Sequence, residues 1–181
     1  MERAARIYEY GPPEVLRIEP IDAPAPGQGE ALIRHTAIGL NFVEVYFRRG
    51  TFQAPTLPAI LGNEGAGIVE AVGPGVTGIN VGDRVVYADG PLGAYATVRL
   101  YPAGDLVRIP DAISDAQAAA SFLRGTTARM LLKEAIPEGE ETAAKAGAHA
   151  YSLRAERKGR SAPHPIVIVR KLIGGDADED G

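Results

Sequence analysis

Few side chains in this sequence have the types and spacing of a reactive centre. His35, His149 and His164 lie in separate segments, and none has a cysteine or a second histidine three or four residues away. They therefore predict no metal triad, and we interpret each as a surface or structural histidine. A nucleophilic serine commonly stands in a Gly-x-Ser-x-Gly elbow, and none of the four serines does; they are Ser114, Ser121, Ser152 and Ser161. Nucleophilic hydrolysis therefore has no support.

Glu64 is the carboxylate with the most unusual sequence surroundings. It stands in the run Leu-Gly-Asn-Glu-Gly-Ala-Gly over residues 61–67, at the approach to a predicted strand. A carboxylate in such a place has to be solvated, paired or bound to a metal, because burying an unpartnered charge is costly. We interpret Glu64 as structural.

Residues 73–78, Gly-Pro-Gly-Val-Thr-Gly, match the pattern G-x-G-x-x-G that is found at dinucleotide phosphates. That function requires a strand before the pattern and a helix that opens directly after it. The residues that follow, Ile-Asn-Val-Gly-Asp over 79–83, are too few and too rich in glycine for a helix. The pattern therefore predicts a hairpin-type turn, in which glycines adopt positive φ.

The first 110 residues or so are typical of an all-β unit, because short β-branched runs alternate with turn signals rich in glycine and proline. A short helix is expected over residues 41–50, where Phe42 and Tyr46 have the i, i+4 spacing that places both on one side of a helical turn. Strands that together could close a small barrel are expected over residues 3–8, 15–20, 30–38, 65–72, 83–87 and 93–100.

The pattern changes at Ser114. Residues 118–132 are rich in Ala, Leu and Met and contain no proline, which favours a helix. Ser114 and Gln117 have the spacing of a capping box at its start. Further on, only residues 166–169 have the pattern of a buried strand, and the acidic end over residues 174–181 is expected to be disordered.

Length and composition limit the class of protein. The 181 residues are 45% hydrophobic and 23% charged, which is typical of a soluble globular protein of at most one and a half domains. The net charge of −4 disfavours nucleic acid and membranes as partners, and the basic run over residues 154–160 has no interleaved aromatic residue. The lack of cysteine, of a signal-peptide core and of a long apolar run predicts a cytoplasmic location.

Six motifs occur in a fixed order over residues 1 to about 134. They are Gly-Pro-Pro-Glu-Val-Leu (11–16), Ala-Ile-Gly-Leu-Asn-Phe (37–42), Leu-Gly-Asn-Glu-Gly-Ala-Gly (61–67), Val-Gly-Asp-Arg-Val (81–85), Gly-Ala-Tyr (93–95) and Ala-Ala-Ala-Ser-Phe-Leu-Arg-Gly-Thr-Thr (118–127). Each motif is weak alone. The ordered set closely resembles the zeta-crystallin-like NADPH:quinone oxidoreductases of the medium-chain dehydrogenase/reductase superfamily.

The resemblance implies a mainly β fold with some α structure. Residues 1–112 would form a GroES-like β-barrel, the alcohol-dehydrogenase-type N-terminal domain, and residues 113–135 a connecting helix toward a cofactor domain of the Rossmann type. Residues 136–181 would be a truncated or frame-altered remnant in place of that domain. Zinc-binding relatives hold a cysteine and a histidine at the positions of Asn41 and Asn63, so the resemblance implies a reductase without a metal.

The resemblance also implies which residues meet the cofactor, NADPH. Asn41, Phe42 and Tyr46 match the segment that lies along its nicotinamide half, and Thr127 matches a threonine of the helix that flanks the same cleft. Such amide, aromatic and hydroxyl groups can bond and stack without adding charge. Phe52 would lie in the substrate pocket, where many members have a tyrosine. No catalytic residue is assigned.

The implied function is an NADPH-dependent quinone or enone reductase, in which hydride passes from the nicotinamide to a small-molecule quinone. The phosphate loop of the family, Ala-Ala-Gly-Gly-Val-Gly, does not follow Lys133, so weak NADPH binding and impaired activity are expected. The alternative is a non-catalytic GroES-like fragment that acts as an interaction or dimerisation module. A homo-oligomer is then expected, because apolar surface that normally packs on the second domain would be exposed.

Overall fold

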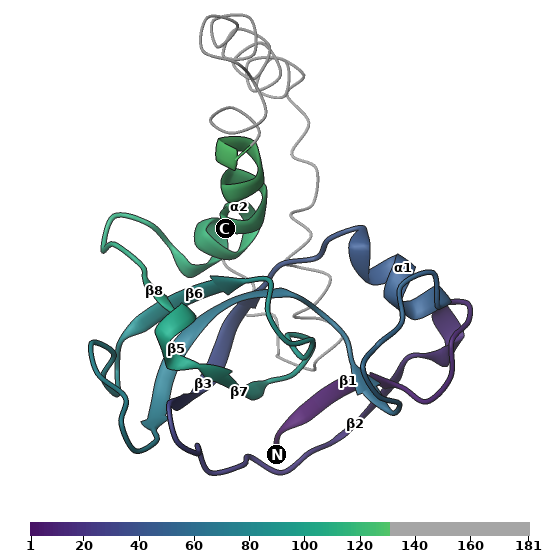
Figure 1. Cartoon of the computed structure of the whole chain (residues 1–181), viewed down its shortest axis with the longest axis horizontal. Helices are drawn as coiled ribbons and strands as arrows, with labels where there is room; N and C mark the ends of the chain where they lie inside the picture. Colours follow the sequence, from purple (N-terminus) through teal and green to yellow (C-terminus); the bar gives the residue numbers. More distant parts are fainter. Residues whose placement is uncertain (131–181) are drawn as a thin grey trace, which may run out of the picture.

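The structure, a computed structural model, describes residues 1–130, which form a mainly β unit with two α-helices (Figure 1). The expected remnant over residues 136–181, its strand and its acidic end lie outside the described residues. In chain order the elements are β1 (Arg3–Ile7), the 3-10 turn η1 (Pro13–Val15), β2 (Arg17–Pro20), β3 (Glu30–Ile38), α1 (Val43–Arg49), β4 (Ala59–Ile60), β5 (Glu64–Val72), β6 (Arg84–Ala88), β7 (Val98–Pro102), the 3-10 turn η2 (Ala103–Asp105), β8 (Val107–Arg108) and α2 (Asp115–Met130).

The strands form two antiparallel sheets. The smaller sheet has the order β2-β1-β4, and the larger has the order β7-β3-β5-β6-β8. An isolated bridge between Ala4 and Ala96 connects β1 to the segment just before β7. Apolar side chains from both sheets meet in one core, whose fully buried members include Ile7, Ile33, Leu61, Val69, Val85 and Tyr101. The predicted mainly β fold is therefore confirmed.

The glycine pattern at residues 73–78 connects β5 to β6, which pair antiparallel. Gly75 and Gly78 have φ of 75° and 80°, a region that side-chain-bearing residues rarely adopt. No helix follows the pattern before β6. The prediction of a hairpin-type turn is thus confirmed, and this pattern offers no phosphate site.

One strand begins later than its sequence pattern predicts. Alternation suggested a strand over residues 93–100, whereas β7 begins at Val98. Gly93 and Ala94 both donate their backbone N–H to the carbonyl of Gly62, at 3.0 and 3.1 Å, and Gly93 has a φ of 141°. Residues 93–95 are therefore held by the loop that precedes β5 rather than by the ladder with β3.

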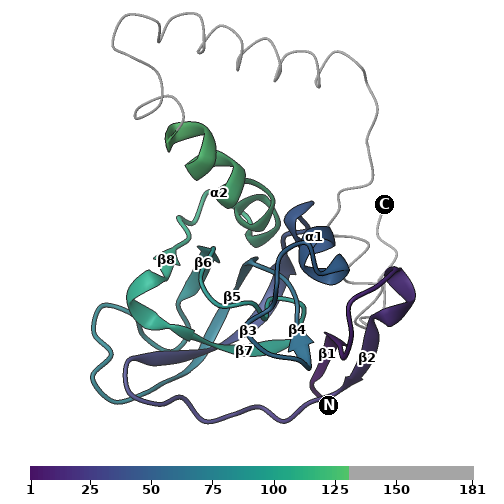
Figure 2. The ribbon, with the colours of Figure 1, turned by 45° about the vertical axis from the view of Figure 1, so that its right-hand side comes forward.

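Helix α2 packs on the larger sheet through small side chains. Ala118 and Ala119 are buried against residues of β3, β5 and β6, and the absence of bulk lets the helix approach the sheet closely (Figure 2). The predicted capping box is present: Ser114 Oγ accepts the N–H of Gln117 at 3.2 Å, and Gln117 Oε1 accepts the N–H of Ser114 at 3.0 Å. From Arg124 onward the helix is exposed, because it continues past the sheet.

Neither helix of residues 1–130 has the length and hydrophobicity of a membrane span.

Candidate functional site

Three of the five predicted site residues come together in an exposed cluster of rings, which we call the aromatic surface. The rings of Phe42 and Tyr46 have centroids 5.3 Å apart in an edge-to-face arrangement, and those of Tyr46 and Phe52 are also 5.3 Å apart. Their exposed fractions are 69%, 39% and 47% for Phe42, Tyr46 and Phe52. Exposed apolar rings in one cluster are typical of a surface that binds a partner or a ligand.

Helix α1 and the turn after it build the aromatic surface. The i, i+4 spacing predicted for Phe42 and Tyr46 places both rings on one side of α1. The helix ends at Gly50, which has a φ of 79° and donates its N–H to the carbonyl of Phe47. This reversal brings Phe52 back beside the helix, where its N–H bonds to the carbonyl of Tyr46 at 3.2 Å.

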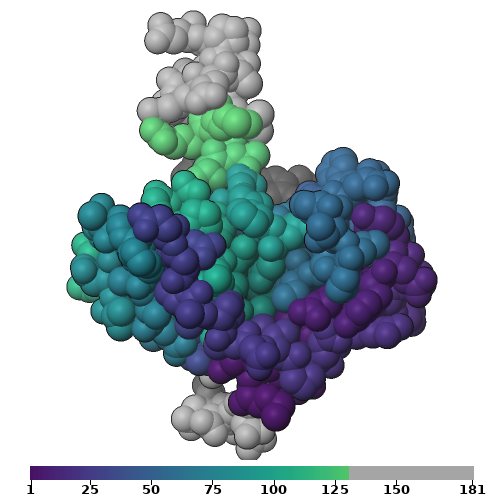
Figure 3. All heavy atoms as spheres, turned by 60° about the horizontal axis from the view of Figure 1, so that its bottom comes forward, coloured from purple at the N-terminus to yellow at the C-terminus, as the bar shows by residue number. Residues whose placement is uncertain are grey.

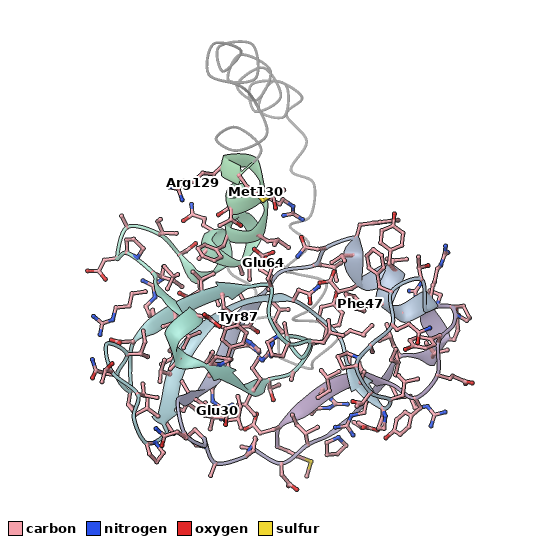
Figure 4. The ribbon with its side chains drawn as sticks, in the orientation of Figure 1. Glu30, Phe47, Glu64, Tyr87, Arg129 and Met130 are labelled. Carbon is pink, nitrogen blue, oxygen red and sulfur yellow. The ribbon has the colours of Figure 1, made fainter. Side chains whose placement is uncertain are left out.

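Asn41 lies on the loop between β3 and α1, directly before Phe42, but its side chain does not join the rings. Its amide Nδ2 donates a hydrogen bond to Glu64 Oε2 at 3.0 Å. Glu64 is the first residue of β5 and is completely buried at the base of α2 (Figure 4). Glu64 is thus buried with hydrogen-bond donors on its carboxylate, as its sequence surroundings require, and its structural role stays an interpretation.

Thr127 is on α2, away from the helix that carries the aromatic surface. Its hydroxyl donates to the carbonyl of Leu123, one turn earlier, at 2.8 Å. No hydrogen bond within residues 1–130 joins Thr127 to α1. The structure therefore brings Phe42, Tyr46 and Phe52 into contact, places Asn41 beside them, and leaves Thr127 on a separate element.

Glu44 is a buried carboxylate in this region that the sequence reasoning missed. Only 4% exposed, it accepts the backbone N–H of Asn41 at 2.8 Å and that of Asn63 at 3.2 Å. Its burial raises the pKa of Glu44 to about 6. The available signal was its position three residues after Asn41, the spacing at which a first-turn carboxylate reaches back to a backbone N–H.

Glu64 also has a raised pKa, because burial disfavours its charge more than the hydrogen bonds from Asn41 and the backbone of Leu123 favour it. Both carboxylates thus accept hydrogen bonds from Asn41, Glu44 from its backbone N–H and Glu64 from its side-chain amide.

A second polar cluster surrounds Tyr87 of β6, whose side chain is completely buried (Figure 4). His35 Nδ1 lies 2.6 Å from the carbonyl of Ala96 and His35 Nε2 lies 2.7 Å from the hydroxyl of Tyr87. Because a carbonyl only accepts, Nδ1 carries the proton and Nε2 accepts from Tyr87. Arg99, only 8% exposed, has its guanidinium 5.1 Å from the ring centre of Tyr87 and 4.9 Å from that of Tyr101.

A cavity of about 760 Å³ opens between the smaller sheet and the segment before β7. Arg6, Pro58, Leu92, Arg99 and Leu100 are among its lining residues, and none of the five predicted site residues of the described chain belongs to that lining. Figure 3 shows the molecule from below, where the N-terminal residues (purple) lie at the front. Because its lining shares no residue with the aromatic surface, this cavity is separate from that surface.

Side chains that bind metals do not gather within residues 1–130: no group of three or more His, Cys, Asp or Glu residues there could hold an ion. The aromatic surface and its two supporting carboxylates are what the described chain offers at this place. Neutral rings, an amide and a hydroxyl suit a planar, uncharged ligand group.

Residues 27–111 match the family model of the alcohol dehydrogenase GroES-like domain. A quinone oxidoreductase of Pseudomonas aeruginosa is 48% identical over 134 residues, which cover 74% of this chain and 41% of the relative. A 2-haloacrylate reductase of a Burkholderia species is 40% identical over 139 residues, 74% of this chain and 42% of the relative. The chain therefore spans less than half the length of these curated relatives.

Solved structures show the same likeness. The quinone oxidoreductase of Escherichia coli in complex with NADPH has a TM-score of 0.72 and 44% identity, over 74% of this chain and 41% of that one. The quinone oxidoreductase of Pseudomonas syringae has a TM-score of 0.73 and 47% identity, over 75% of this chain and 42% of that one.

The fold and its matched residues define the class: this is a GroES-like domain of the alcohol dehydrogenase type. Within that class, 74–75% of the chain is 44–48% identical to quinone oxidoreductases, in line with the resemblance that its six ordered motifs indicate.

Proposed function

We propose that this chain supplies the nicotinamide side of an NADPH-dependent quinone or enone reductase. The aromatic surface of Phe42, Tyr46 and Phe52 carries the proposal, because three exposed rings, with Tyr46 in contact with the other two, form a neutral platform for a planar group. The E. coli relative whose solved structure holds NADPH supports the choice of cofactor. When bound, NADPH supplies a hydride to an electron-poor acceptor.

The residues of the chain would act by placement rather than by acid or base chemistry. Phe42 and Tyr46 would cover the nicotinamide half and exclude water from it, and Asn41 would offer an amide group beside them. Phe52 would face the quinone or enone with a ring that lacks the hydroxyl of a tyrosine, so it contributes shape alone. Thr127 would border the same ligand from α2.

The phosphate half of NADPH has no comparable site in the described part of the chain. The glycine pattern at residues 73–78 forms a turn between the antiparallel strands β5 and β6, and no helix begins there. A pyrophosphate site combines the backbone N–H groups of a glycine loop with those of a helix N-terminus, and this turn lacks the helix. We therefore expect saturable but weak binding of NADPH. Zinc independence, the cytoplasmic location and the domain limits at residues 112 and 135 stay predictions.

A titration of the purified chain with NADPH, followed by nicotinamide fluorescence, tests the proposal. Phe42→Leu removes the most exposed ring of the aromatic surface but keeps an apolar side chain. Tyr8→Leu is the matched control, because Tyr8 is an exposed aromatic residue elsewhere, 43% exposed and bonded to Glu19. We expect Phe42→Leu to weaken binding about fivefold to tenfold, about the 1 kcal/mol that one aromatic contact contributes, and Tyr8→Leu to leave it unchanged.

Equal affinities for the two variants would contradict the assignment of the aromatic surface. Complete absence of binding, from a chain that still unfolds cooperatively, would favour the second candidate, a non-catalytic interaction or dimerisation module. That candidate is supported by the exposed half of α2, where Met130 is 50% exposed, together with the exposed rings. Sedimentation equilibrium would then show a dimer that Phe42→Leu weakens.

A further inference from the structure

Asn41 is held by two buried carboxylates at once. Its backbone N–H donates to Glu44 Oε2 at 2.8 Å, and its side-chain Nδ2 donates to Glu64 Oε2 at 3.0 Å. Neither carboxylate takes part in an ion pair within residues 1–130. Both therefore rely on N–H donors to compensate for burial, and Asn41 supplies one to each.

The bond to Glu64 decides which end of the Asn41 amide faces inward. An ionised carboxylate only accepts hydrogen bonds, so the group that faces it has to be the NH₂ end. Oδ1 of Asn41 is then turned away from Glu64. Within the described residues it accepts no hydrogen bond, and it is not among the buried polar atoms without a partner, so it is open to solvent as an acceptor.

The second oxygen of Glu64 binds α2. Its Oε1 accepts the backbone N–H of Leu123 at 2.6 Å, in the middle of the helix. The carbonyl of the same Leu123 accepts the hydroxyl of Thr127 at 2.8 Å. A continuous path of hydrogen bonds thus leads from Asn41 through Glu64 and the main chain of Leu123 to Thr127, two predicted site residues that lie on different elements.

Gly39 makes this path possible. A methyl group at its position would overlap the carboxylate of Glu64 and would lie 2.7 Å from the carbonyl oxygen of Ala119. The space left by the missing side chain is what lets the Glu64 carboxylate lie between the loop and α2. Arg124 adds a second connection, since its Nη2 donates to the carbonyl of Leu40 at 3.2 Å.

We propose that Glu64 is a positioning residue, which fixes the side-chain amide of Asn41 with Oδ1 outward and ties it to the turn of α2 that bears Thr127. Presented in this way, Asn41 accepts a hydrogen bond from a neutral ligand that carries an N–H or O–H donor. The inference about the ligand rests on the proposed function. The orientation of the amide does not, because it follows from the contacts of Glu64 alone.

Glu64→Gln tests the orientation without any ligand. Asn41 Nδ2 and Leu123 N donate to different oxygens of Glu64. A glutamine replaces one of these oxygens by an NH₂ group, which cannot accept, so one of the two hydrogen bonds is lost and the link between the Asn41 amide and α2 is broken. In ¹⁵N spectra of the whole chain, with the Asn41 side-chain signals identified by their loss in Asn41→Asp, we expect Glu64→Gln to shift the side-chain NH₂ of Asn41 and the amide of Leu123 together. Glu30→Gln is the control, because within residues 1–130 the Glu30 carboxylate accepts only the N–H of Gly27, and it should move neither signal.

The wild-type chain gives a second measurement in case Glu64→Gln does not fold. The bonded Nδ2 proton of Asn41 should exchange with water at least tenfold more slowly than the side-chain protons of Asn80, an exposed residue whose side chain makes no hydrogen bond within residues 1–130. Equal exchange rates, or Asn41 signals that coincide in wild type and Glu64→Gln, would overturn the proposal.

The titration with NADPH separates the two proposals. If wild type binds, Glu64→Gln should lower the affinity about tenfold while Glu30→Gln retains it. If wild type does not bind, the proposed function fails, and the spectra still decide whether Glu64 positions Asn41. Unchanged affinity in Glu64→Gln, with the Asn41 signals shifted, would overturn the part of the inference that concerns the ligand.

Discussion

Gly39 lies directly against Ala119 of α2, so that a methyl group on Gly39 would be 2.7 Å from the Ala119 carbonyl oxygen. Real carbon–oxygen contacts do not come so close, and the helix would have to move away from the sheet. Because α2 packs there through buried Ala118 and Ala119, such a shift opens a closely packed interface. The loop before Asn41 therefore packs closely against α2, the helix that bears Thr127.

Gly39→Ala should therefore destabilise the chain by about 1–3 kcal/mol, the usual cost of overpacking. The matched control is Gly125→Ala on the exposed part of α2, where a methyl group meets no atom within 4 Å. Alanine favours a helix over glycine, so the control should stabilise by about 0.5–1 kcal/mol. Urea unfolding of both variants measures the two changes in unfolding free energy. If Gly39→Ala were as stabilising as Gly125→Ala, the close packing described for Gly39 would be contradicted.

The capping box at Ser114 gives a second prediction. Ser114→Ala removes the oxygen that accepts the N–H of Gln117 and should cost about 1 kcal/mol of unfolding free energy. Ser121→Ala is the control, since in the described part of the chain the Ser121 hydroxyl bonds only to the carbonyl of Gln117, one turn earlier in the helix. It should change stability by less than about 0.5 kcal/mol, because it caps no free N–H. A loss as large as that of Ser114→Ala would contradict the assignment of the cap.

Local sequence signals predicted the features that depend on neighbours along the chain. The alternation over residues 30–38 coincides with β3, the spacing of Ser114 and Gln117 gave the cap, and the spacing of Phe42 and Tyr46 gave the paired rings of α1. The strands β4 and β8 were missed, because each has two residues and exists through pairing with a distant strand, β4 with β1 and β8 with β6.

The support of the site could not be predicted, because it depends on contacts between residues far apart in the chain. Glu64 and Leu123 are 59 positions apart, and their hydrogen bond exists only because α2 folds back onto β5. The sequence pattern indicated that Glu64 needed partners but not which ones. The family resemblance indicated Asn41 and Thr127 as site residues. The hydrogen bonds that connect them became visible only in the structure, where α2 packs on the sheet.

Arg99 provides a third prediction. Its buried guanidinium lies over Tyr87 and Tyr101 and donates to the carbonyls of Pro91 and Leu92, at 2.9 and 3.4 Å. Lysine has no planar group to stack there and cannot reach the same acceptors, so Arg99→Lys should destabilise by about 2 kcal/mol.

The control is Arg108→Lys, on β8. The Arg108 side chain is 53% exposed and pairs with Asp83 at 2.8 Å, and an exposed ion pair contributes about 0–1 kcal/mol. In thermal unfolding, Arg99→Lys should melt at a clearly lower temperature than wild type, whereas Arg108→Lys should melt close to wild type. Similar losses for both would mean that the stacking on Tyr87 and Tyr101 does not stabilise the barrel.

The last prediction concerns pH. Burial lowers the pKa of His35 to about 4, because the ring is withdrawn from solvent and is held neutral between Ala96 and Tyr87. In the unfolded chain the ring has its ordinary pKa of about 6.5. Between these values the unfolded state binds more protons, so the contribution of His35 to stability is complete above pH 6.5 and is lost as the pH falls toward 4.

His35→Gln removes this titration, so the gap in unfolding free energy between wild type and His35→Gln should narrow by roughly 2–3 kcal/mol from pH 7 to pH 4. Glu44 changes stability in the opposite sense, since its raised pKa gives the folded chain the extra proton below pH 6. It is present in both proteins, so its effect cancels in the difference. A constant gap between wild type and His35→Gln in urea unfolding would show that His35 titrates alike in the folded and unfolded chain.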